Sequence, residues 1–199
     1  MNHFPTKLGA AGCALALSLF CGCGEPSNEG TSGGSQKPAA PQVVVPAEQQ
    51  QFVGVVAPFI QKYEAAPNEL KKSALRAERK TALADALKSL EFNDWVGTLK
   101  TMETTSKGNA HVQIELRGAP ITIMNNNNEV SAALGDKTLI SMKSELFKTI
   151  SKLNEGQRVR VSGNFIKGGK DFIEELSLTE DGAMTEPEFS VKFTKVEKY

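Results

Sequence analysis

One continuous stretch, from Leu153 to Phe165, most restricts what this chain can fold into. It reads as the end of a helix, then a turn, then a strand in which apolar and polar residues alternate. The positions expected to face inward are Val159, Val161, Gly163 and Phe165. Because three strand patterns come before this helix and strand, the order predicts a small closed barrel.

Strand patterns lie on both sides of this stretch. They cover residues 95–102, 110–117 and 121–123 before it, and 172–179 and 189–196 after it. Apolar residues at helical spacing over 146–153 predict a helix between the third and fourth strands. We therefore expect a mainly β fold with helices: a five-stranded Greek-key barrel of the oligonucleotide/oligosaccharide-binding (OB) type, with an additional strand at the C-terminus.

Several short motifs in this region resemble the bacterial tRNA-anticodon-like OB-fold family. The resemblance covers about half of the chain and rests on Trp95-Val96-Gly97, on Leu153-x-x-Gly156-x-x-Val159-x-Val161-Ser162-Gly163-x-Phe165, on Glu175-x-Ser177-Leu178-Thr179-Glu180 and on Pro187-Glu188-Phe189. These motifs are structural, so the resemblance implies the OB fold and no particular activity. It implies neither catalytic residues nor a role in nucleic-acid binding.

The N-terminal segment is typical of an export signal. An apolar run over residues 8–20 is too short to span a bilayer permanently, and it ends in Leu19-Phe20-Cys21-Gly22-Cys23. This ending resembles the lipobox of bacterial lipoproteins, in which a small residue precedes the lipidated Cys. We expect a signal peptide over 1–22 and lipidation of Cys23; an ordinary cleaved signal and an N-terminal membrane helix are the alternatives.

The residues after Cys23 are expected to form a flexible tether over 23–46. This segment is rich in Gly, Ser, Pro, Glu and Gln and contains few large apolar residues, so it cannot bury enough surface to fold. Gly24 follows the Cys, and the absence of Asp there resembles sorting to the outer membrane. We therefore expect an exported protein that is lipid-anchored to a bacterial membrane and faces the periplasm.

A helical segment over 47–91 should precede the OB domain, which spans 92–199. Pro58 lies inside the first helical pattern and should kink it or mark a restart, and Asn68 is a plausible N-cap of the second helix. The second helix should bury an apolar face and expose a basic one. The apolar face is Leu70, Ala74, Ala77, Leu83, Leu87 and Leu90, and the basic face is Lys71, Lys72, Arg76, Arg79 and Lys80. The basic face could contact anionic lipid or nucleic acid, but interspersed acidic residues favour a solvated surface.

The reactive side chains needed for catalysis are scarce. After the signal the chain has a single histidine, His111, expected on the outward face of a strand, and no thiol except Cys23. These residues cannot assemble a zinc site. Acidic residues near the C-terminus, from Glu174 to Glu188, lack the EF-hand spacing and are expected in a solvated loop. We therefore expect neither an enzyme nor a metal or cofactor.

The function expected from these observations is a non-enzymatic binding or scaffold module at the cell envelope. Its contact surface should be the outer face of the first three strands, with residues 103–109 and 167–170 at the rim. The candidate contact residues are Gln113, Glu115, Arg117 and Thr122. The partner could be an envelope protein, a glycan or a small ligand. The alternative is an oligonucleotide-binding protein, which is disfavoured because Lys and Arg total 23 and Asp and Glu also total 23, and because Trp95 is expected in the core.

Overall fold

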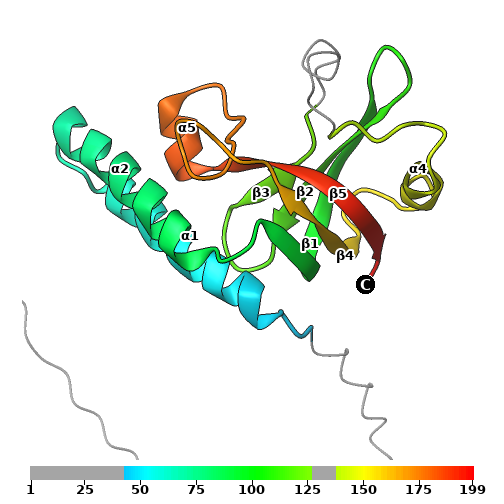
Figure 1. Ribbon diagram of the computed structural model, residues 1–199, viewed down its shortest axis with the longest axis horizontal. Helices are drawn as coiled ribbons and strands as arrows, with labels where there is room; N and C mark the ends of the chain where they lie inside the picture. The colour runs from blue at the N-terminus through cyan, green and yellow to red at the C-terminus, as the bar shows by residue number, and fades with distance from the viewer. Residues whose placement is uncertain (1–42, 127–137) are drawn as a thin grey trace, which may run out of the picture. The chain divides into compact units, whose positions relative to one another are not determined.

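The computed structural model describes residues 43–126 and 138–199, and Val43–Tyr199 form one compact unit (Figure 1). The expected signal peptide and most of the expected tether lie outside the described residues. The described elements are α1 (Ala47–Glu64), α2 (Glu69–Ala86), β1 (Glu91–Thr104), β2 (Ala110–Leu116), β3 (Thr122–Met124), α4 (Glu145–Ile150), β4 (Arg158–Phe165), α5 (Glu180–Thr185) and β5 (Glu188–Lys198).

The five strands close into a barrel in the order β1-β2-β3-β5-β4. All neighbouring strands are antiparallel except β3 and β5, which pair in parallel over Thr122–Met124 and Glu188–Ser190. The helix α4 lies between β3 and β4 in the chain, and Ser144 caps it by accepting a hydrogen bond from the Phe147 N–H. This arrangement confirms the predicted OB-type barrel with a helix between its third and fourth strands.

The fifth strand of the barrel is not the predicted one. Residues 172–179 form no strand in the described chain, and β5, expected as an additional strand, closes the barrel. The reason is that β5 fills the positions beside both β3 and β4, so the segment before it makes only single bridges, Lys167 with Ile173 and Glu175 with Phe189. The alternation of buried and exposed residues expected over 172–179 also breaks down at Leu178, which is fully exposed.

Two glycines occupy positions where the strands approach closely. A Cβ atom on Gly97 of β1 would lie 2.6 Å from the Glu115 carbonyl oxygen, and one on Gly163 of β4 would lie 2.6 Å from the Lys192 carbonyl oxygen. Both separations are shorter than any ordinary contact, and the β4–β5 register shifts at Ser162/Gly163. The barrel therefore bends where a side chain would not fit.

The helices α1 and α2 lie together along one side of the barrel, and α4 lies on the opposite side (Figure 1). The helix α1 continues through Pro58 as one element, so the predicted restart does not occur. Phe52 of α1 enters the aromatic core, with its ring centroid 5.2 Å from Trp95 and 5.2 Å from Phe165. The first predicted helix therefore belongs to the barrel's hydrophobic core.

The helix α2 begins as predicted but buries a different face. Asn68 caps it by accepting a hydrogen bond from the Lys71 N–H at 3.0 Å. Leu75 and Leu83 are buried, whereas Leu70, expected inside, is 85% exposed. Leu83 was predicted on the apolar face and is buried, but Leu70, Ala74 and Ala77 are exposed because α2 buries only a narrow stripe, against α1 and α5, that includes Arg79.

The close approach at Gly163 predicts a large effect from a single methyl group. We expect Gly163→Ala to lower the free energy of unfolding by about 2 kcal/mol, because the new Cβ forces β4 and β5 apart. Gly169→Ala is the matched control, since a Cβ there would meet no atom within 4 Å. Urea denaturation of both variants measures the difference; equal stabilities would contradict the bend at Gly163.

Candidate functional site

Two of the predicted contact residues, Glu115 and Arg117, line a surface hollow of about 300 Å³ at the end of β2. Thr98 of β1 and Arg158 of β4 line it as well, and the turn Gly118–Ala119 forms its edge. Neither Thr98 nor Arg158 was singled out from the sequence. Arg158 occupies a polar position in the alternating pattern of β4, and this position alone indicated in the sequence that its side chain faces outward.

The pairing of the strands explains why these side chains share one surface. Arg158 of β4 pairs with Thr98 of β1, Thr98 pairs with Glu115 of β2, and Glu115 pairs with Thr122 of β3. Directly paired residues point to the same face of a sheet, and neighbouring strands lie about 4.8 Å apart. These four positions therefore form one row across the outer face, with Arg117 two residues beyond Glu115.

The charged side chains of the hollow differ in whether they have an ionic partner within the protein. The Glu115 carboxylate accepts a hydrogen bond from the Lys100 Nζ atom at 3.1 Å. Arg117 and Arg158 are exposed and have no hydrogen-bonding or ionic partner for their side chains among the described residues. The hollow therefore carries two guanidinium groups that remain available for a ligand.

Gln113 is only half-buried, but its amide is engaged with His111, at 3.2 Å between the two Nε2 atoms. His111 was expected on the surface, and this prediction is wrong: the side chain is 3% exposed. Its Nδ1 atom lies 2.7 Å from the Asn125 carbonyl oxygen. A carbonyl can only accept, so Nδ1 carries the proton and Nε2 accepts from Gln113.

Asn125 explains the burial of His111. Its side chain extends the pairing with β2, accepting from the Val112 N–H at 2.8 Å and donating to the Ala110 carbonyl at 2.9 Å. The chain after β3 therefore remains against β2, and the ring of His111 is enclosed there. Nothing in the alternating pattern of β2 indicated this.

Four of the five basic side chains of α2 contact the chain between β4 and β5, and the expectation of a solvated basic face is wrong for Arg79, which is buried. Arg79 is 3% exposed and donates from Nε and Nη2 to the Asp171 carboxylate at 2.9 and 2.7 Å. Lys80 donates to the Gly169 carbonyl at 2.7 Å. Further from the barrel, Lys72 pairs with Asp181 and Arg76 with Glu180.

The acidic residues of this segment are therefore partners of α2 and of the local backbone. In addition to the ion pairs of α2, Glu175 accepts hydrogen bonds from Ser177 and from the Glu188 N–H. The expectation of a wholly solvated acidic loop is wrong for these residues. The complementary charges of the basic helix and the acidic segment were the signal in the sequence for this pairing.

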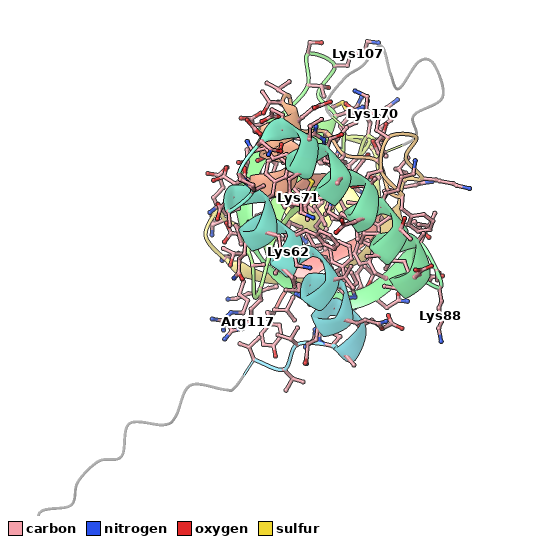
Figure 2. All side chains as sticks on the ribbon, turned by 90° about the vertical axis from the view of Figure 1, so that its left-hand side faces the viewer. Lys62, Lys71, Lys88, Lys107, Arg117 and Lys170 are labelled. Atoms are coloured by element: carbon pink, nitrogen blue, oxygen red, sulfur yellow. The ribbon has the colours of Figure 1, made fainter. Side chains whose placement is uncertain are left out.

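A larger cavity, of about 810 Å³, lies between α2 and residues 168–184. Three of its four basic groups, Arg76, Arg79 and Lys80, have partners in the protein, and only the exposed Lys170 has none among the described residues. The turn 167–170, expected at the rim of the contact surface, borders this cavity. Figure 2 shows Lys170 and Lys107 at one end of the unit and Arg117 at the other. We therefore place the candidate site at the smaller hollow.

A hydrogen-bonded group joins α1, α2 and α5. The Tyr63 hydroxyl donates to Asp181 at 2.7 Å and accepts from Arg76 at 2.8 Å, and Lys72 lies 3.3 Å from the same carboxylate. Hydrogen bonds from Tyr63 and then from Lys72 lower the pKa of Asp181. Burial, followed by the hydrogen bond to Asp181, raises the pKa of Tyr63. This group therefore stabilises the docking of α5 while Asp181 is charged.

Comparison with protein-family models, with curated proteins and with solved structures finds no match. Within residues 43–126 and 138–199, no group of three or more His, Cys, Asp or Glu residues could hold a metal ion. None of the helices in the described ranges is long and apolar enough to cross a membrane.

The buried pair of Arg79 and Asp171 predicts a large loss of stability when only one partner is removed. We expect Arg79→Met to lower the free energy of unfolding by about 3–5 kcal/mol, because it leaves a buried carboxylate uncompensated. Arg79→Met combined with Asp171→Leu should recover most of this loss. Arg76→Met, one turn earlier with an exposed ionic partner, should cost about 1 kcal/mol or less. Urea denaturation measures the free energy of unfolding of all three variants. If Arg79→Met alone is as stable as the double variant, the buried ion pair does not have the proposed effect on stability.

The pKa of Asp181 predicts a dependence of stability on pH. A carboxyl group whose pKa is lowered on folding stabilises the protein above its ordinary pKa, and this contribution is lost as the pH falls through the folded value. Asp181→Asn should therefore destabilise the protein at about pH 7 and leave its stability nearly unchanged at about pH 3 or below. Urea midpoints across this range provide the measurement.

Glu188 supplies a control of opposite sign. Burial first, then Glu175 and Glu186, raise its pKa, so its charge costs stability above the folded pKa and the cost vanishes below the ordinary value. Glu188→Gln should stabilise the protein at neutral pH and have no effect in acid. Parallel pH profiles for the Asp181 and Glu188 variants would contradict at least one of the two assignments.

Proposed function

We propose that this protein is a non-enzymatic binding or scaffold module that is exported and held at the bacterial cell envelope by acyl chains on Cys23. The lipobox-like ending at Gly22-Cys23 and the polar segment after it support the anchor. A multiply acylated Cys would hold the protein firmly, since each buried methylene contributes about 0.8 kcal/mol. The mature protein then extends from the outer membrane into the periplasm.

The observation that best supports a binding role is the hollow lined by Glu115, Arg117, Thr98 and Arg158. It combines two cationic side chains without partners among the described residues, one carboxylate and one hydroxyl; Thr98, Glu115 and Arg158 lie on barrel strands, and Arg117 lies in the turn directly after β2. Sites that recognise small ligands typically combine a concave surface with a few fixed polar groups. Residues on adjacent strands hold such groups more rigidly than a loop does.

The chemistry of the described residues favours binding over catalysis. His111, the single histidine after the signal, is buried and fixed by Asn125 and Gln113, so it is not available as a general base. Binding of single-stranded nucleic acid is less well supported, because it uses exposed aromatic rings, and Trp95 is 2% exposed.

The anchor can be tested on the mature N-terminus. We expect mass spectrometry to find a cleaved chain that begins with an acylated Cys23, because the small residue Gly22 permits cleavage between Gly22 and Cys23. Cys23→Ser should move the protein out of the membrane fraction, whereas Cys21→Ser should leave it there. An intact Met1, or a cleaved but unacylated end, would refute the anchor.

The binding role can be tested with the chain from residue 23 to 199 carrying Cys23→Ser. We expect this chain to retain one component of an envelope extract or a glycan set, and to lose it when Glu115 and Arg117 are both replaced by Ala. Lys71→Ala is the control, since Lys71 is exposed on α2, away from Arg117 (Figure 2). Tight binding of single-stranded DNA or RNA that weakens steeply with salt would favour the oligonucleotide-binding alternative.

A further inference from the structure

The arginines of the sequence divide into two groups. All of them, at positions 76, 79, 117, 158 and 160, lie in the described residues. Arg76 and Arg79 form ion pairs, and the guanidinium carbon of Arg160 lies 5.0 Å from the centre of the Tyr199 ring. The two arginines without a partner among the described residues, Arg117 and Arg158, both line the same 300 Å³ hollow.

We propose that this hollow binds a phosphate ester that also carries a hydroxyl group, with the phosphate between Arg117 and Arg158. The inference rests on the proposed function, because it specifies the ligand of the binding surface described there. A guanidinium group presents a planar fork of N–H donors that matches two oxygens of a phosphate. A phosphate monoester has three terminal oxygens, one more than a carboxylate, so two forks and the Thr98 hydroxyl can all bind it.

Glu115 determines which phosphate compound fits. Its carboxylate lines the hollow, and its exposed ion pair with Lys100 only partly neutralises it, since surface pairs are weak. It therefore repels any phosphate group, whether free or esterified. It can accept a hydrogen bond from a ligand hydroxyl, which stabilises a phosphate ester of a polyol relative to the free anion. The hollow is at the small end of ligand sites, so the polyol is short.

A second depression supplies room for an apolar part of the ligand. It measures about 550 Å³, shares Arg117 and Gly118 with the hollow, and is lined by Val43, Val44, Val45 and Val53. Val44 is 75% exposed. A polyol phosphate with an apolar substituent, such as the glycerol phosphate headgroup of a lipid, fits both depressions. A soluble polyol phosphate fits the first alone.

The described N-terminal residues lie beside the hollow, which favours a lipid as the source of the ligand. The described chain begins at Val43, at the end of the unit where Arg117 lies (Figure 2). If Cys23 is acylated, the anchor is 20 residues before Val43 in the sequence, so this surface belongs to a protein held at a membrane that can supply such headgroups. The shared chemistry is the polyol phosphate, and experiment can separate the two sources.

The test uses the 23–199 chain with Cys23→Ser, which has no acyl group, so failure of lipidation cannot affect the result. Nuclear magnetic resonance titration with glycerol 3-phosphate should shift the amide signals of Thr98 and Gly118 saturably. Arg117→Gln and Arg158→Gln should each weaken binding about tenfold or more, and Lys71→Gln should leave it unchanged. All three side chains are exposed, and urea midpoints confirm that the variants fold.

Two further comparisons sharpen the assignment. Glycerol 3-phosphate should bind more tightly than inorganic phosphate, and Glu115→Ala should reduce or reverse this preference. Sedimentation with phosphatidylcholine vesicles, with and without phosphatidylglycerol, identifies the source. Arginine-dependent binding to the anionic vesicles indicates the lipid, and binding of glycerol 3-phosphate alone indicates a soluble ester.

Absence of saturable binding to both glycerol 3-phosphate and the anionic vesicles would overturn the proposal, as would equal binding by the parent and both arginine variants. Neither result would affect the wider proposal of a binding module. That proposal depends on retention of an envelope component and on the mass of the mature N-terminus.

Discussion

The closure of the barrel is the constraint on which the rest of this structure depends. A closed sheet has no free edge, and here β5 pairs with β3 on one side and with β4 on the other. The long connection between β4 and β5 consequently has no strand to join, and it must be stabilised by other contacts. Two kinds of contact stabilise this connection. The ion pair of Arg79 and Asp171 is buried, and the ion pairs between α2 and α5 are exposed. The helical pair and the connection therefore depend on each other.

The same helical pair determines which part of the barrel wall remains accessible. Gln49 of α1 is fully buried, and its amide accepts from the Val96 N–H and donates to the Val96 carbonyl, both at 2.7 Å. This side chain substitutes for a neighbouring strand at that point of β1. Val96 also lines one side of the hollow, which continues to the half-buried Thr98 two residues further along. The proposed site is thus the part of the outer face where the cover provided by α1 ends.

The sequence predicted most of the architecture because local chemistry decides it. Alternation at Val159 and Val161 identified β4, and Asn68 identified the start of α2. The errors have a common cause, which is that tertiary contacts override local patterns. Leu75 is buried in place of Leu70 because α2 touches its neighbours along a narrow stripe, and residues 172–179 lose their strand partners to β5. Glu115 and Arg117 were predicted as contact residues from alternation alone, but placing Arg158 beside them required knowledge that β4 pairs with β1.

The aromatic cluster has a consequence for how this protein can be observed. Trp95 is the only tryptophan, and its ring centroid lies 5.2 Å from Phe52 of α1 and 4.9 Å from Phe92 of β1. Its side chain is 2% exposed, so the indole is shielded from bulk solvent. The wavelength of the tryptophan fluorescence therefore reports on the packing of α1 against the barrel. Release of the helix would admit water to the ring and shift its fluorescence to the red, which makes the attachment of α1 visible without any added label.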